Sequence, residues 1–229
     1  MEGKYEQHTV VVETLGVRLP GDLVIPGGAK GIVLFAHGSG SSRHSPRNRY
    51  VASVLHNAGL ATLLIDLLTP DEERVDNITR SLRFDIEMLS NRLTGAVDWL
   101  ARHPATSDLP VGTFGASTGA AAALGAAADR ADRVVAVVSR GGRPDLAGSV
   151  LARVHAPTLC IVGELDAPVL ELNRAALSIL ASEEKELQIV PGATHLFEEP
   201  GTLEEAARLA RDWFVRHLAS DLVAGRAAA

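Results

Sequence analysis

The chain has 229 residues, of which 46% are hydrophobic and 22% charged, values typical of one globular domain with a full core. A net charge of −6 predicts no general affinity for nucleic acid or anionic membranes. The single cysteine, Cys160, excludes an intrachain disulfide and is expected to be a buried, inert thiol. No secretion signal or membrane-length apolar run is evident, so a single cytoplasmic domain over residues 1–229 is the expectation.

The elements follow a regular pattern along the chain. Two strand-like runs, Gln7 to Glu13 and Val17 to Ile25, form a predicted hairpin through Gly16. Six apolar runs then alternate with helical segments, as parallel strands buried on both faces do. These strands are predicted at Gly31 to Ala36, Ala61 to Leu67, Pro110 to Phe114, Arg133 to Ser139, Thr158 to Val162 and Glu186 to Val190. The helices are predicted at Asn48 to Asn57, Ile78 to Ala101, Thr118 to Asp129, Pro168 to Ala181 and Leu203 to Ala219.

This alternation predicts an α/β fold with a mostly parallel, eight-stranded, doubly wound sheet flanked by helices. In such sheets, ligands bind at the carboxyl ends of the strands, so the loop after each strand is a candidate position for functional residues. The tail from Ala224 to Ala229 is expected to be frayed.

The pentapeptide Gly115-Ala116-Ser117-Thr118-Gly119 lies between the fifth predicted strand and an alanine-rich helical run. A G-x-S-x-G pattern in this context is typical of a nucleophile elbow, a strained turn that lifts a serine hydroxyl out of the sheet. Ser117 is therefore the predicted nucleophile. A dinucleotide-binding turn is the less favoured alternative, because the glycines do not follow the G-x-G-x-x-G spacing.

A turn rich in glycine and serine, from His37 to Ser42, follows the third strand. Turns at this position can supply a backbone N–H to an oxyanion hole, which stabilises the negative oxygen formed during acyl transfer. The N–H groups of Ser39 and Thr118 are the predicted donors. A flexible loop is the alternative, and a P-loop is excluded because no Gly-Lys-Ser/Thr follows.

Carboxylates and a histidine follow the last two strands. Asp166 is predicted to orient an imidazole and stabilise its charged form. Glu164 is the fallback, and capping of the following helix is the alternative role for Asp166. His195 lies on the loop after the eighth strand, where it can take the proton of the nucleophile. The order Ser117, Asp166, His195 is the order of nucleophile, acid and base in α/β-hydrolases.

With these residues, nearly the whole chain resembles the dienelactone hydrolase-like group of α/β-hydrolases. The run from His37 to Asn48, HGSGSSRHSPRN, resembles a subgroup of small bacterial serine hydrolases, including segments joined to phosphoribosyltransferase domains. Dienelactone hydrolases proper have a cysteine nucleophile and a glutamate where this chain has Gly38. The resemblance therefore implies a general carboxylic-ester hydrolase.

Two groups of arginines follow strand ends near the expected site. Arg140 and Arg143 follow the sixth strand, and Arg43 begins a second group after the predicted oxyanion turn. Arginine binds carboxylates and phosphates in a bidentate manner, so Arg140 and Arg43 are candidate groups for binding an anionic substrate. Ion pairing within the protein, for instance with Asp66, is the alternative.

The expected activity is hydrolysis of small soluble carboxylic esters through an acyl-enzyme. The segment from Arg143 to Ala156 is too short for a lid domain, which favours an open site and soluble substrates. Three alternatives stay open: a thioesterase or acyltransferase, a dienelactone-type lactone hydrolase, and a catalytically silent binding module. No metal or cofactor is expected, because no Cys/His cluster has ligand spacing.

Overall fold

The computed structural model describes residues 5–219, and the tail for which fraying is predicted lies outside this range. The strands are β1 (Tyr5–Thr14), β2 (Val17–Pro26), β3 (Ile32–Ala36), β4 (Ala61–Ile65), β5 (Val111–Ala116), β6 (Val134–Arg140), β7 (Thr158–Gly163) and β8 (Lys185–Val190). The α-helices are α1 (Pro46–Asn57), α2 (Pro70–Thr79), α3 (Ile86–Arg102), α4 (Gly119–Asp129), α5 (Ala167–Ile179) and α6 (Thr202–Leu218). Two 3₁₀ segments are η1 (Leu82–Phe84) and η2 (Pro144–Arg153).

The eight strands form one sheet in the order β1-β2-β4-β3-β5-β6-β7-β8. The pairs β1–β2 and β2–β4 are antiparallel, and the strands from β4 through β8 are parallel neighbours. The predicted mostly parallel, eight-stranded sheet is therefore confirmed. Because the parallel strands end at one edge, the loops after β3, β5, β6, β7 and β8 converge there.

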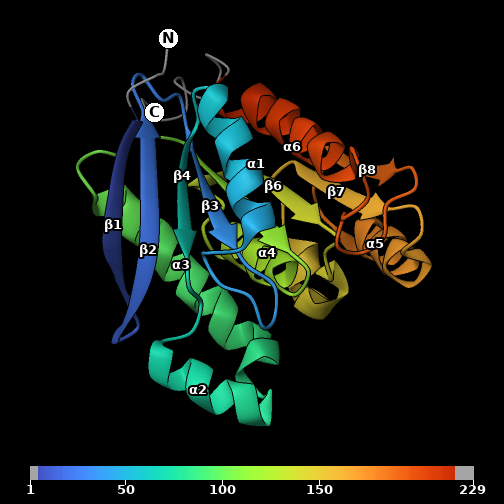
Figure 1. Cartoon of the computed structure of the whole chain (residues 1–229), viewed down its shortest axis with the longest axis horizontal. Helices are drawn as coiled ribbons and strands as arrows, with labels where there is room; N and C mark the ends of the chain where they lie inside the picture. The colour runs from blue at the N-terminus through green and yellow to red at the C-terminus, as the bar shows by residue number, and fades with distance from the viewer. Residues whose placement is uncertain (1–4, 220–229) are drawn as a thin grey trace.

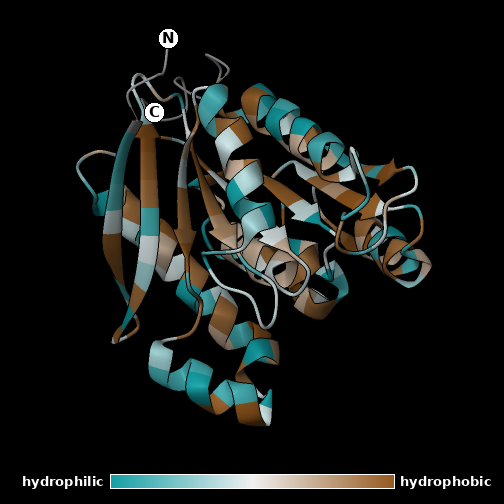
Figure 2. Cartoon of the chain, viewed as in Figure 1, coloured by the Kyte–Doolittle hydropathy of each residue, from teal (hydrophilic) through white to brown (hydrophobic). Residues whose placement is uncertain are grey.

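Helices cover both faces of the sheet (Figure 1). Helices α3, α4 and α5 pack with η2 on one face, and α1 and α6 pack on the other. Hydrophobic residues dominate the strands, whereas the outward side of α6 is hydrophilic (Figure 2). Cys160 of β7 is fully buried, as predicted, and burial raises the pKa of its thiol to about 12. Within residues 5–219, no helix is long and apolar enough to cross a membrane.

Helix α4, which directly follows the elbow, consists almost entirely of alanine and glycine. Alanine has the highest helix propensity, and its small side chain lets neighbouring helices approach closely. A Cβ at Gly125 would lie 2.4 Å from Ser90 Oγ on α3, so this helix contact requires glycine. The small residues therefore allow α4 to be buried between the sheet and α3.

The single helix predicted from Ile78 to Ala101 is wrong. Helix α2 ends at Thr79, Arg80 adopts a left-handed conformation with φ of 57°, and α3 begins only at Ile86. The carboxylate of Asp76 accepts the N–H groups of Leu82 and Arg83 at 2.8 and 3.0 Å, which replaces the hydrogen bonds of a continuing helix.

Helix α3 begins with a separate N-cap. Asp85 caps it, because its side chain accepts the Met88 N–H at 3.0 Å. Helix α2 was not predicted, although Thr69 and Glu72 form a capping box at its N-terminus. Arg92 of α3 binds both carboxylate oxygens of Glu72, which holds α2 against α3.

Candidate active site

Ser117 lies on a strained turn between β5 and α4. Its φ is +51°, in the left-handed region that non-glycine residues rarely adopt. A Cβ at Gly115 would lie 2.3 Å from Ala120 Cα, and one at Gly119 would lie 2.3 Å from the Ala36 carbonyl oxygen. The two glycines of the pentapeptide therefore permit the close strand–helix contacts that hold the serine in this conformation.

Asp166 and His195 form a short hydrogen bond between the loops after β7 and β8. The distance from His195 Nδ1 to Asp166 Oδ2 is 2.6 Å. Asp166 occupies the N-cap position of α5, but its side chain makes no capping hydrogen bond and is engaged with the imidazole instead. Glu164, the alternative acid, accepts the Gly192 N–H at 2.8 Å. It therefore stabilises the loop after β8 that carries His195, called the histidine loop below, and not the imidazole ring itself.

The segment after β6 connects the serine and histidine loops. The Ser117 N–H donates to the Arg140 carbonyl at 3.3 Å, and the Arg143 N–H donates to the Ser117 carbonyl at 2.9 Å. A Cβ at Gly141 would lie 3.7 Å from His195 Cε1, so this glycine lies directly beside the imidazole. Within residues 5–219, neither Ser117 Oγ nor His195 Nε2 has a hydrogen-bond partner. In many hydrolases the hydrogen bond between the serine hydroxyl and the histidine ring tightens only when substrate binds.

The predicted oxyanion turn packs on Ser117, the predicted nucleophile. A Cβ at Gly38 would lie 3.0 Å from Ser117 Cβ, so a larger residue here would require the turn or the serine to shift by a few tenths of an ångström. The Ser39 N–H donates to Thr118 Oγ1 at 2.9 Å and is therefore engaged within the protein. The Thr118 N–H donates to no acceptor in the described part of the chain. One of the two predicted donors is thus free, and the other is occupied by the neighbouring hydroxyl.

His37 holds the turn in place as a neutral imidazole. Its Nε2 accepts the Leu67 N–H at 3.0 Å, so the ring proton lies on Nδ1, which donates to the Gly38 carbonyl at 2.9 Å. Burial lowers the pKa of His37 below its usual value, and the Gly38 bond opposes this shift. His37 is therefore a positioning residue of the turn rather than a catalytic base.

The lowered pKa of His37 makes stability depend on pH. The unfolded chain takes up a proton at an ordinary histidine pKa of about 6.5, whereas the folded chain resists it, so stability is complete above this pH and falls as pH decreases. A non-titrating His37→Gln variant should reduce the slope of unfolding free energy against pH, by up to about 1.4 kcal/mol per pH unit, as the pH falls below about 6.5. Urea unfolding at several pH values measures the slope. His8→Gln, on the exposed surface of β1, is the control, and an equal effect of both variants would contradict the assignment.

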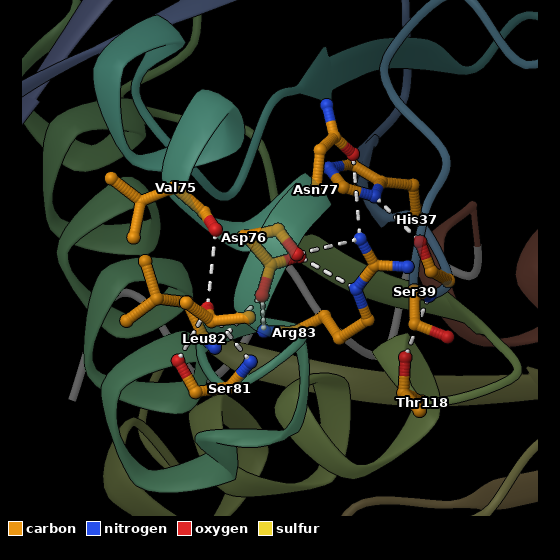
Figure 3. Close-up of polar contacts among 11 residues, drawn as sticks. His37, Ser39, Val75, Asp76, Asn77, Ser81, Leu82, Arg83 and Thr118 are labelled. Carbon is orange, nitrogen blue, oxygen red and sulfur yellow. Dashed lines mark hydrogen bonds and ion pairs between the residues drawn. The ribbon is translucent and has the colours of Figure 1, made fainter.

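A hollow with about 470 Å³ of empty space, part of it open to solvent, lies beside the turn. The turn, Thr118 and the α2–η1 segment line it. Figure 3 shows the polar contacts among residues of these segments. Arg83 Nε donates to buried Asp76 at 2.6 Å, and a Cβ at Gly40 would lie 3.1 Å from Arg83 Nη1, so the guanidinium is fixed close to the turn. Sequence reasoning missed Arg83, because it lay inside a helix predicted as continuous.

The two arginines predicted to bind an anionic substrate have different surroundings. The guanidinium of Arg43 forms an ion pair with Asp66, and the backbone N–H of Arg43 donates to the same carboxylate at 2.7 Å. The Nε atom of Arg43 also lies 3.6 Å from Asp22 Oδ1. These contacts favour the alternative of structural ion pairing for Arg43. Arg140 is buried and has no carboxylate partner among residues 5–219.

The strand order, the strained turn at Ser117 after β5 and the positions of Asp166 and His195 after β7 and β8 match the α/β-hydrolase fold. The family model "Dienelactone hydrolase family" matches residues 19–218, and the chain belongs to this family of hydrolases. It is similar to the crystal structure of a dienelactone hydrolase from Anabaena variabilis, with 61% identity and a TM-score of 0.91 over 93% of this chain and 99% of that one.

More distant and longer relatives complete the comparison. Est1E from Butyrivibrio proteoclasticus has 16% identity and a TM-score of 0.76 over 93% of this chain and 99% of its own, a likeness of fold alone. Two curated relatives from Mycobacterium tuberculosis strains CDC 1551 and H37Rv are 62% identical over 202 residues. Both are named as proposed phosphoribosyl transferases. The match covers 88% of this chain but 44% of theirs, so the chain spans less than half of their length.

Proposed function

We propose that the chain hydrolyses small soluble carboxylic esters through Ser117, His195 and Asp166. The observation that carries the proposal is the 2.6 Å contact between His195 Nδ1 and Asp166 Oδ2, at the same sheet edge as a serine with φ of +51°. A carboxylate on Nδ1 leaves Nε2 as the base and stabilises the imidazolium that forms. The short η2 connection between β6 and β7 is consistent with soluble rather than aggregated substrates.

The proposed reaction has two steps. His195 Nε2 takes the proton from Ser117 Oγ, which attacks the ester carbonyl and forms a tetrahedral oxyanion. The Thr118 N–H donates to this oxygen, and the Ser39 N–H joins it by leaving the Thr118 hydroxyl. The imidazolium then protonates the departing alcohol, and a water molecule activated by His195 hydrolyses the acyl-enzyme.

The names of the relatives bear differently on this proposal. The Anabaena protein, named a dienelactone hydrolase, matches almost completely and keeps a lactone, which is a cyclic ester, among the candidate substrates. The transferase name belongs to proteins of which this chain spans 44%. Since the family model covers most of this chain, we assign the hydrolase chemistry to the shared part and any transferase chemistry to the remainder of those proteins.

A fluorophosphonate probe with intact mass spectrometry, run beside assays of short p-nitrophenyl esters, tests the proposal. We expect one adduct, mapped to Ser117, and ester turnover that is lost in proportion to labelling. Faster cleavage of the matching thioester would favour a thioesterase, and transfer to added alcohols an acyltransferase. A folded protein with neither adduct nor turnover would contradict the proposal and favour a binding module.

A further inference from the structure

Arg140 is a buried arginine without a carboxylate partner in the part of the chain that the structure describes. It ends β6, and only 7% of its surface is exposed. Arg92, the other buried arginine within residues 5–219, donates to the two oxygens of Glu72 at 2.8 and 2.5 Å. Of these two buried guanidinium groups, one is therefore neutralised by a carboxylate and the other, that of Arg140, is not.

The contacts of Arg140 do not satisfy its donors. Nη2 makes one long contact of 3.4 Å with Asn48 Oδ1, while Nε and Nη1 are buried and have no hydrogen bond within the described residues. The rings of Phe114 and Phe197 have centroids 5.9 and 5.8 Å from its Cζ. Aromatic faces attract a cation but leave its N–H donors unpaired. The guanidinium therefore has free hydrogen-bonding capacity in a water-poor environment.

The charges nearby make this environment more positive. Burial, and then the charge of Arg47, lower the pKa of Arg140 to about 10. Arg47 lies in the first turn of α1, which contains no acidic residue, and its own partner is Glu198 at 3.1 Å. The helix N-terminus adds further positive potential. A buried charge without a partner is costly, and such groups are concentrated at ligand-binding sites.

Arg140 also lies next to the proposed nucleophile. It pairs with Ala116 across β5 and β6, and its carbonyl accepts the Ser117 N–H at 3.3 Å. Its Cα is therefore about one strand spacing, roughly 4.8 Å, from β5, which ends one residue before the serine. Phe197, whose ring faces the guanidinium, follows His195 by two positions on the histidine loop. The unpaired cation thus borders the serine strand and the histidine loop.

We propose that Arg140 binds a carboxylate or phosphate group carried by the ester substrate, beside the bond that Ser117 attacks. The anion takes the unpaired N–H donors and replaces the long contact with Asn48. Arginine suits this task, because its planar guanidinium matches the geometry of an oxyanion. Half-esters of dicarboxylic acids and esters of phosphorylated alcohols are the implied substrate classes. The inference rests on the proposed ester hydrolysis, but anion binding can be measured without turnover.

Thermal unfolding in succinate and in inorganic phosphate, against chloride at the same ionic strength, measures the binding. Both anions stabilise folded proteins nonspecifically, so the measured quantity is the difference between wild type and variant. We expect at least one of the two anions to raise the Tm of the wild-type protein clearly more than that of Arg140→Met. The anion that gives the larger difference is the one the site prefers. Arg143→Met is the matched control, because Arg143 also follows β6 but binds Asp145 through Nε and Nη2 at 2.8 Å. Arg140→Gln replaces Arg140→Met if the latter does not fold. Equal stabilisation of the wild type and the Arg140 variant by both anions would overturn the site.

Turnover tests the substrate role. The ratio of kcat/KM for p-nitrophenyl hemisuccinate to that for neutral p-nitrophenyl butyrate should fall roughly 10- to 100-fold in Arg140→Met and stay constant in Arg143→Met. An unchanged ratio would overturn the proposal. If the anions nevertheless stabilised the protein through Arg140, the site would bind free anions but not the anionic group of an ester substrate. If the wild type cleaves neither ester but the anions still stabilise it through Arg140, the anion site stands and ester hydrolysis is contradicted.

Discussion

The Ser117→Ala variant is expected to lose p-nitrophenyl ester turnover by about 10⁴-fold or more and to give no fluorophosphonate adduct. In the proposed mechanism the hydroxyl oxygen of Ser117 forms the acyl-enzyme, so no neighbouring group is expected to replace it. The fold should be unaffected, because Ser117 Oγ has no hydrogen-bond partner within residues 5–219 and alanine experiences the same backbone strain at φ of +51°. Steady-state kinetics, intact mass and urea unfolding measure the three effects.

A second serine truncation controls for nonspecific effects. Ser178 lies on the exposed side of α5, where its hydroxyl donates only to the Ala175 carbonyl at 2.7 Å. Ser178→Ala should keep wild-type turnover and labelling. If Ser117→Ala retained wild-type esterase activity, the acyl-enzyme mechanism at Ser117 would be wrong. If its unfolding midpoint fell strongly, a loss of activity would no longer identify the nucleophile.

The sheet was predictable because its buried strands consist almost entirely of apolar or small residues. Strands β3, β4, β5 and β7 are buried at every position, so their sequences are short uninterrupted apolar or small-residue runs. Parallel strands buried on both faces require such runs, and they can hardly be read as anything else once helices alternate with them. The positions of Ser117, Asp166 and His195 were then predictable from the rule that functional residues follow strand ends.

The connection between β4 and α3 was not predictable by the same means. Helix α2 buries only Asp76, so it lacks the apolar periodicity by which helices are recognised. Its start was nevertheless encoded in Thr69-Pro70-Asp71-Glu72, a capping box with proline in the first turn. The break after Thr79 depends on the Asp76 carboxylate, which accepts the N–H groups of Leu82 and Arg83. No local sequence pattern predicts this orientation of the side chain.

The missed parts of the site depend on contacts between distant segments. Arg83 reaches the turn at Gly40 only because Asp76 fixes its guanidinium within the α2–η1 connection. The lack of a partner for Arg140 follows from the side chains of α1 and of the histidine loop that enclose it. The sequence identified both Arg140 and Arg43 as candidates and favoured Arg140, but it could not show that Arg43 is paired with two aspartates.

The second large effect is expected from Asp166, the carboxylate after β7 that contacts His195. Asp166→Asn should lower kcat about 10⁴-fold with little change in KM, because an amide cannot stabilise the imidazolium or hold the correct tautomer of His195. Its side chain makes no capping bond to α5, so stability should change little. Measurement of kcat, KM and the rate of fluorophosphonate labelling separates chemistry from binding.

Glu164→Gln is the matched control, two residues earlier on the same loop. Glu164 accepts the Gly192 N–H at 2.8 Å, and the glutamine carbonyl oxygen can keep this bond, so activity should remain within a few-fold of wild type. A larger loss in Glu164→Gln than in Asp166→Asn would make Glu164 the acid and overturn the assignment. Equal losses would mean that the position of the histidine loop, rather than the charge on Asp166, limits the reaction. The expected asymmetry follows from geometry alone, since one carboxylate touches the imidazole and the other touches the backbone of its loop.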